Sequence, residues 1–147
     1  MRYLCIDLGD KRTGLAISDS VTRIVSPLDV LEVPITDRNG DALLDALLAA
    51  IFTNFSPASP LEIIFGLPLN MTDASEGPRA KLVRNFAARL GPRLQPARDI
   101  RFHDERLSSV QADWTMAQSG MTHKQKKTRR DALAAAAILT DYLSTIA

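Results

Sequence analysis

Residues 3–18 read YLCIDLGDKRTGLAIS, in which two short apolar runs flank a tight polar turn. The first run, Tyr3–Leu8, is apolar except at position 7, which is typical of a central strand covered on both faces. The second run, Thr13–Ser18, follows the turn Gly9–Arg12 so closely that an antiparallel hairpin is the simplest interpretation. Asp7 therefore places a carboxylate inside a strand that is expected to lie in the core.

Beyond this hairpin, the apolar residues alternate between strand-like and helix-like patterns. Three further strands are predicted at Leu28–Val33, Leu61–Phe65 and Ile100–His103. Helices are predicted to start at Asp41 and Gly77-Pro78, and to span Ser108–Gly120 and Thr128–Ile146. The order β-β-β-α-β-α-β-α-α predicts an α/β fold, a mixed five-stranded sheet with helices on both faces, in one domain over residues 1–147.

The composition is that of an ordinary globular protein. The hydrophobic content of 46% and the charged content of 24% exclude a disordered chain. We expect a cytoplasmic protein with no membrane association, because the sequence shows neither a signal peptide nor an apolar stretch long enough to span a bilayer. The single cysteine, Cys5, cannot form an internal disulfide, which fits a reducing compartment.

Positive charge is concentrated in one stretch, THKQKKTRR at 122–130. The net charge is only +1, and without the five basic residues of this stretch it would be −4. We interpret the stretch as a basic loop, for which a solvated surface loop is the plain alternative. Its basic residues are Lys124, Lys126, Lys127, Arg129 and Arg130.

Three acidic residues are candidates for catalysis. Asp7 is the strongest candidate. Burying a charged carboxylate in a central strand costs on the order of several kcal/mol of folding free energy unless the group is paired or binds a metal. Glu105 follows the end of a predicted parallel strand, the edge where open α/β sheets place their sites, although it could instead be an exposed acid paired with Arg106. Asp131 would, taken alone, be a helix cap within the capping box that starts at Thr128.

Taken together, the three carboxylates can converge over one edge of the sheet. Such carboxylates repel each other unless a cation lies between them, and hard oxygen ligands favour Mg²⁺ or Mn²⁺ over zinc. The sequence is compatible with one metal ion or with two. It also allows Asp10 or Asp104 to act as an additional ligand. This arrangement predicts metal-dependent phosphodiester hydrolysis. The basic stretch, together with Lys11, Arg12 and Arg106, would then contact the phosphates of a nucleic acid.

The sequence also resembles the YqgF family over essentially its whole length. The motifs that carry the resemblance are DLGDKRTGLA at 7–16 with Ser18-Asp19, GLPLNM at 66–71, DERLSS at 104–109, and Asp131-Ala132 with Ala135-Ala136 and Ile138-Leu139. One departure is the absence of a glycine from the turn after Asn70-Met71, where Thr72-Asp73-Ala74-Ser75 follows.

Members of this family are Holliday-junction-resolvase-like proteins assigned to maturation of the 5′ end of pre-16S ribosomal RNA. The resemblance implies the ribonuclease H-like fold and the positions of an acidic triad at Asp7, Glu105 and Asp131. It also implies pre-rRNA as the substrate, with pre-ribosomal particles as partners.

Three alternatives remain open at the level of sequence. The chain could resolve branched DNA, because the spacing of residues does not distinguish RNA from DNA. It could be a nucleic-acid-binding assembly factor without turnover. The DLG turn also resembles the phosphate-binding turn of actin-like ATPases and sugar kinases, but those proteins need two such domains and this chain is too short.

Overall fold

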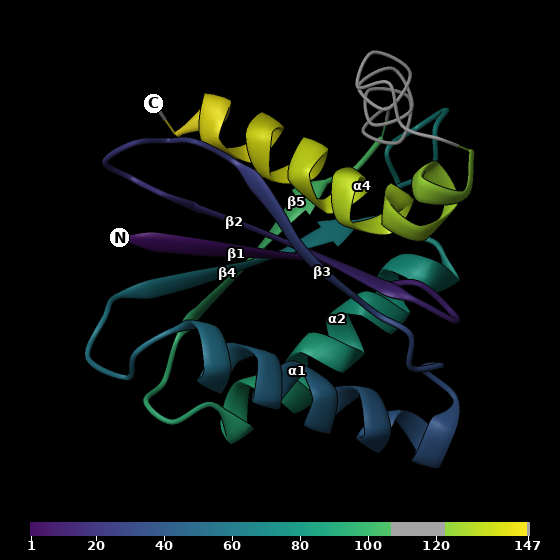
Figure 1. The fold of residues 1–147 in the computed structure, drawn as a ribbon. Helices are drawn as coiled ribbons and strands as arrows, with labels where there is room; N and C mark the ends of the chain where they lie inside the picture. Colours follow the sequence, from purple (N-terminus) through teal and green to yellow (C-terminus); the bar gives the residue numbers. More distant parts are fainter. Residues whose placement is uncertain (107–122, 147) are drawn as a thin grey trace.

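The computed structural model describes residues 1–106 and 123–146, with the side chains of the last helix from position 129 (Figure 1). Five strands form one sheet in the order β3-β2-β1-β4-β5. Strand β1 pairs antiparallel with β2 and parallel with β4, while β3 pairs antiparallel with β2 and β5 parallel with β4. The predicted mixed five-stranded sheet is therefore confirmed. The strands are β1 Arg2–Asp7, β2 Thr13–Asp19, β3 Ser26–Leu31, β4 Leu61–Leu67 and β5 Asp99–Asp104.

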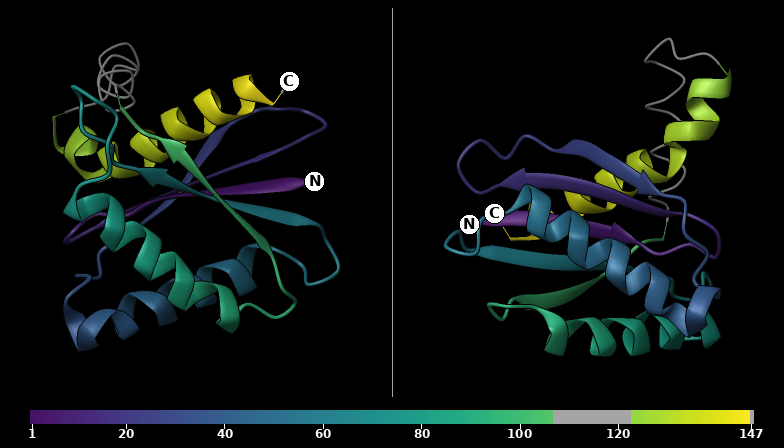
Figure 2. Two further views of the ribbon diagram at one scale, coloured as in Figure 1. Left: turned by 180° about the vertical axis from the view of Figure 1, so that it is seen from behind. Right: turned by 60° about the horizontal axis from the view of Figure 1, so that its bottom comes forward.

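Helices cover both faces of the sheet, as predicted. Helices α1 (Asp41–Asn54) and α2 (Pro78–Leu90) lie on one face, and α4 (His123–Thr145) lies on the other (Figures 1 and 2). Two 3-10 turns, η1 (Asp37–Gly40) and η2 (Gly91–Arg93), precede α1 and follow α2. In the described part of the chain, no helix is both long and apolar enough to cross a membrane.

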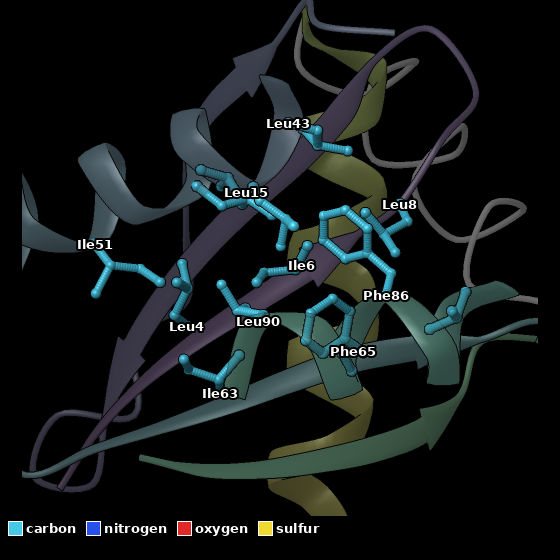
Figure 3. Packing of buried hydrophobic residues seen from close by; sticks show 14 of the residues in the cluster. Leu4, Ile6, Leu8, Leu15, Leu43, Ile51, Ile63, Phe65, Phe86 and Leu90 are labelled. Atoms are coloured by element: carbon cyan, nitrogen blue, oxygen red, sulfur yellow. The ribbon is translucent and has the colours of Figure 1, made fainter. Parts of the chain in front are cut away.

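The main core fills the space between the sheet and the pair α1 and α2 (Figure 3). Its fully buried side chains include Leu4, Ile6, Leu15, Leu43, Ile63, Phe65 and Leu90. A second, smaller cluster lies under α4, where small alanines let the helix approach the sheet. Strand β1 contributes alternate residues to the two clusters, so that a central strand covered on both faces is confirmed.

Most strand boundaries differ from the sequence predictions by one or two residues, and the start of α4 differs by five. Strand β3 starts and ends two residues earlier than predicted. Helix α4 starts at His123 rather than Thr128, so the prediction of a basic loop is wrong: residues 123–130 are the first turns of this helix. The physical reason is that lysine, glutamine and arginine are good helix formers, and a run of them continues a helix readily. The predicted helix Ser108–Gly120 lies outside the described residues.

Candidate active site

Asp7 is the last residue of β1, at the edge of the sheet where the parallel strands β1, β4 and β5 all end. Its side chain is half-buried, between β2 on one side and β4 on the other. The pKa of Asp7 is raised well above its usual value, first by burial, then by the charge of Glu105 and then by that of Asp131. The carboxylate of Asp7 is therefore present in the central strand as predicted, in a half-buried position.

Glu105 follows β5 directly and is fixed by its backbone N–H, which donates to the Leu67 carbonyl oxygen at 3.2 Å. Its carboxylate lies over Gly66 of β4, where an added Cβ would be only 2.7 Å from Glu105 Oε2. The side chains of Asp7 and Glu105 share a hydrogen bond. Burial raises the pKa of Glu105 too, while the hydrogen bond with Asp7 and the charge of Arg79 oppose that rise. The two carboxyls therefore form a hydrogen-bonded pair, in which burial and repulsion favour the protonated form of Asp7.

Asp131 comes to this pair because α4 touches β2 at Gly14, the residue opposite Asp7 in the antiparallel register. A Cβ at Gly14 would lie 1.9 Å from the Asp131 carbonyl oxygen, so only glycine allows this contact. Because α4 begins at His123, Asp131 is in the helix interior, and the alternative that it is a helix cap is wrong. Its carboxylate Oδ2 accepts a hydrogen bond of 2.9 Å from Arg12 Nε.

Arg79, in the first turn of α2, adds a cation that the sequence prediction did not assign to the site. Its guanidinium pairs with the Asp10 carboxylate and reaches the Leu8 carbonyl oxygen at 3.4 Å. Its charge also lowers the pKa values of Asp7 and Glu105. A sequence signal for Arg79 existed, because a cation at the start of a helix opposes the helix dipole and is expected to have another reason to be there.

Two further acids lie beside the site in ion pairs of their own. Asp10 is held by Arg79, whereas both carboxylate oxygens of Asp104 are bound by the backbone and guanidinium of Arg106, at 2.9 and 2.8 Å. This hydrogen bonding lowers the pKa of Asp104. The alternative pairing of Glu105 with Arg106 is therefore wrong, because Arg106 turns to Asp104.

The predicted basic residues differ in where they lie. Arg12 and Arg106 border the carboxylates but are engaged by Asp131 and Asp104, while Lys11 is exposed in the turn between β1 and β2. Arg129 is exposed and lines a hollow of about 430 Å³ beside β3 rather than the carboxyl pair. Arg130 is exposed on the same helix. Lys124, Lys126 and Lys127 are in the first turns of α4, and their side chains lie outside the described part.

The carboxyl pair has the chemistry of a site for a hard divalent cation. Both carboxylates would offer oxygen ligands to such a cation, and Asp131 is close enough to raise the pKa of Asp7. As the described side chains stand, no three or more His, Cys, Asp or Glu residues are grouped to hold a metal ion. The Asp131 carboxylate is instead paired with Arg12.

Comparison with known proteins connects this geometry to a family. A family model described as RuvX, Holliday junction resolvase, matches residues 1–145. The chain is 38% identical over 143 residues to a protein of Anaeromyxobacter sp. (strain Fw109-5), covering 97% of this chain and 96% of that protein. It is 37% identical over 141 residues to a protein of Ruegeria pomeroyi, covering 96% and 84%. Both relatives carry the name "Putative pre-16S rRNA nuclease".

Solved structures of low sequence identity share the fold. RuvC of T. thermophilus in complex with a Holliday junction substrate superimposes with a TM-score of 0.59 at 12% identity, over 99% of this chain and 96% of that one. The Fowlpox virus resolvase in complex with Holliday junction DNA gives a TM-score of 0.59 at 10% identity, over 99% of both chains. The expected ribonuclease H-like fold is thereby confirmed.

Proposed function

Because the chain belongs to the RuvX family, which confirms the YqgF resemblance, we propose that it is a metal-dependent nuclease that processes the 5′ end of pre-16S ribosomal RNA. The proposed site consists of Asp7, Glu105 and Asp131, with Mg²⁺ or Mn²⁺ as the cofactor. The substrate is the one named for the relatives, and pre-ribosomal particles in the cytoplasm are the proposed setting.

The observation that carries this proposal is the half-buried pair of carboxyls, Asp7 and Glu105, at the carboxyl edge of the sheet. Burial and mutual repulsion raise the pKa of Asp7, which costs stability, and such perturbed groups cluster at functional sites. The neighbouring glycines Gly14 and Gly66 support the same view, because Gly14 lets the backbone of Asp131 approach β2 and Gly66 leaves room for the Glu105 carboxylate as well as for Ile138. The chain therefore maintains an unfavourable cluster of negative charge in a defined place.

A bound divalent cation would lower the pKa of a water molecule and offset charge on the scissile phosphate. The residues of the chain would hold and orient the substrate around that centre. Asp7 and Glu105 would present oxygen ligands to the cation, and Asp131 would join them on exchanging its partner Arg12. The guanidinium groups of Arg12 and Arg79, which neutralise carboxylates in the free protein, would then bind phosphate oxygens beside the cleaved bond.

Branched DNA is the second candidate substrate, favoured by the description of the matching family model as a Holliday junction resolvase. The fold and the carboxylates would serve cleavage of either nucleic acid, because the hydrolysis of the phosphodiester is the same. The choice depends on how the strands around the cleavage point are held, and it has to be tested with both substrates.

The test is cleavage of end-labelled precursor 16S rRNA and, separately, of a four-way DNA junction, with Mg²⁺ or Mn²⁺ present. Asp7→Asn is expected to abolish cleavage while the protein stays folded, because the amide cannot replace the carboxylate as a ligand. Asp99→Asn is the matched control, since Asp99 is exposed at the other end of β5. Cleavage by Asp7→Asn, or no cleavage of either substrate by the parent protein, would contradict the proposal; the second result would favour a binding factor.

A further inference from the structure

A groove of about 550 Å³ lies between α2 and the segment that leads into α1. Its apolar lining includes Ile35, Leu82 and Phe86, and its polar lining includes Asn39, Lys81 and Asn85. Volumes of roughly 300–1,000 Å³ with an apolar lining and a few polar groups are typical of sites for small ligands. A nucleobase has the matching chemistry, with two apolar faces and a polar edge.

The rim of this groove is built from strained backbone. Arg38, Asn39 and Gly40 are three consecutive residues with positive φ, at 48°, 56° and 89°. The left-handed conformation is unfavourable for a residue such as Arg38, whereas glycine and, to a lesser degree, asparagine adopt it more readily. Arg89 holds the strained segment, because its Nη1 donates to the Asn39 carbonyl oxygen at 2.8 Å and its Nη2 to the Asp41 carboxylate at 2.7 Å. Strain kept in place in this way is characteristic of ligand-binding segments.

The polar groups of the groove are available to a ligand. Within the described part of the chain, Lys81 and the Asn85 side chain make neither a hydrogen bond nor an ion pair, and both residues are exposed. By contrast, Arg84 on the same helix is held by both carboxylate oxygens of Glu76, at 2.6 and 2.9 Å. The charge of Lys81 acts on the Glu76 carboxylate without forming an ion pair, so its ammonium is available to a phosphate, and the Asn85 amide to the edge of a base.

The groove is linked to the carboxylate site through Asp10 and the start of α2. The Ile35 backbone N–H donates to the Asp10 carbonyl oxygen at 3.0 Å, and Pro78 at the groove precedes Arg79, which pairs with the Asp10 carboxylate. Figures 1 and 2 both show the turn between β1 and β2 on the same side of the molecule as the start of α2. Asp10 and Arg79 therefore lie between the groove and the carboxyl pair, and Arg79 is close enough to lower the pKa of Asp7.

We propose that the groove binds an unpaired nucleotide of the substrate strand, next to the phosphate that is cleaved. The Lys81 ammonium contacts its phosphate, the Asn85 amide contacts the edge of its base, and Leu82 supports the face of the base. A base can enter only when it is unstacked, so the groove selects single-stranded nucleic acid over a blunt duplex. This inference rests on the proposed function, for which it specifies the strandedness of the substrate.

The test is fluorescence anisotropy with a labelled single-stranded RNA of about ten nucleotides, within the usual span of single-strand sites. A blunt duplex of the same sequence is the comparison, and EDTA is present so that nothing is cleaved. Asn85→Ala is expected to weaken single-strand binding about 5-fold with an unchanged salt dependence, as for the loss of one neutral hydrogen bond. Lys81→Ala is expected to reduce the slope of log affinity against log salt by about 0.7.

Arg101→Ala is the matched control, because Arg101 is an exposed cation that faces Glu62 on the α4 side of the sheet. Asn85→Asp keeps the shape of Asn85 and should weaken binding more than Asn85→Ala, since it adds repulsion toward phosphate. Equal binding by parent, Asn85→Ala and Lys81→Ala proteins would overturn the inference, and so would equal losses in Lys81→Ala and Arg101→Ala. Binding is measured without metal, so the two proposals fail separately. If the parent protein cleaves but the substitutions leave binding unchanged, only the inference about the groove is refuted. If the substitutions weaken binding but the parent protein does not cleave, only the proposed nuclease activity is refuted.

Discussion

Gly14→Ala is expected to separate α4 from the sheet and to disable the site. The new Cβ would lie 1.9 Å from the Asp131 carbonyl oxygen, 2.3 Å from its carbonyl carbon and 2.9 Å from the Ala132 nitrogen. Cβ atoms do not approach other atoms within 3.0 Å, so the helix backbone must recede by about 1 Å. Because backbone cannot rotate away as a side chain can, we expect the upper end of the cost of overpacking, about 3 kcal/mol.

For a domain of this size that cost corresponds to a fall in melting temperature of about 10 °C. The assay is thermal unfolding followed by circular dichroism, together with the cleavage assay at a temperature where both proteins are folded. A recession of about 1 Å would also move Asp131 away from Asp7, and displacement of this size in a site typically costs about 100-fold in rate. An unchanged melting temperature and an unchanged rate would refute the argument that this glycine sets the distance between α4 and β2.

Gly66→Ala is the matched comparison, because its new Cβ would meet the ends of side chains instead of backbone. The nearest atoms are Glu105 Oε2 at 2.7 Å and Ile138 Cδ1 at 2.8 Å. We expect a loss of only about 1 kcal/mol, since both side chains can rotate, but a large loss of activity because Glu105 is displaced from Asp7. A loss of stability as large as that of Gly14→Ala would contradict this distinction between backbone and side-chain obstacles.

Three further predictions concern single contacts. Ala74→Gly should stabilise the protein by about 0.5–1 kcal/mol and so raise its melting temperature by a few degrees, because Ala74 has a φ of 58° that glycine adopts freely. An unchanged or lower melting temperature would refute this prediction. Burial and a hydrogen bond to Glu62 raise the pKa of Tyr142 to about 12, so its stabilising effect is complete below pH 10 and is lost as the pH rises through about 12. Ultraviolet titration of the parent and Tyr142→Phe proteins checks this. The phenol that is present in the parent and missing from Tyr142→Phe should titrate near 12, and titration of that phenol near 10 contradicts the prediction. Arg12→Ala should free the Asp131 carboxylate and tighten the binding of Mn²⁺ to the substrate-free protein by about 5-fold, which corresponds to the upper range for an exposed ion pair. Titration calorimetry measures this affinity, and unchanged or weaker Mn²⁺ binding would contradict the prediction.

The fold could be predicted from the sequence because its signals are local. The apolar run around Cys5 gave a strand covered on both faces, and the short turn after it gave the hairpin of β1 and β2. The start of α4 does not follow from the sequence in the same way, because a run of charged residues is compatible with both a loop and a helix. At His123 the sequence turns strongly basic, yet basic residues form helix as readily as loop, so charge alone does not mark the start of α4.

The positions of the acidic residues also followed from topology, but their partners did not. Glu105 was expected at the edge where parallel strands end, and it is there beside Asp7. The alternative to a catalytic role pairs Glu105 with its neighbour Arg106, but the Arg106 side chain turns to Asp104, two residues back in the chain. Such choices depend on side-chain geometry, which a pattern of residue types does not contain.

The absent glycine in the turn after Asn70 is a further case in which the sequence marked a place but not its conformation. Ala74 takes the left-handed conformation there, and its N–H donates to the Asn70 carbonyl oxygen at 3.0 Å. The Asn70 side chain in turn donates to Ser75 Oγ at 2.7 Å. The turn thus keeps a conformation that glycine would favour, and these hydrogen bonds offset part of the strain of alanine.

The charges around the carboxyl pair suggest why metal and substrate would bind together. The inner pair, Asp7 and Glu105, shares a hydrogen bond, and each of the outer acids is neutralised by an arginine. These outer pairs are Asp10 with Arg79, Asp104 with Arg106, and Asp131 with Arg12. In the proposed nuclease, Asp7, Glu105 and Asp131 would hold a divalent cation together, and Arg12, released from Asp131, would be left for a phosphate. Each ligand would thus remove a cost of binding the other, and such a coupling acts equally in both directions.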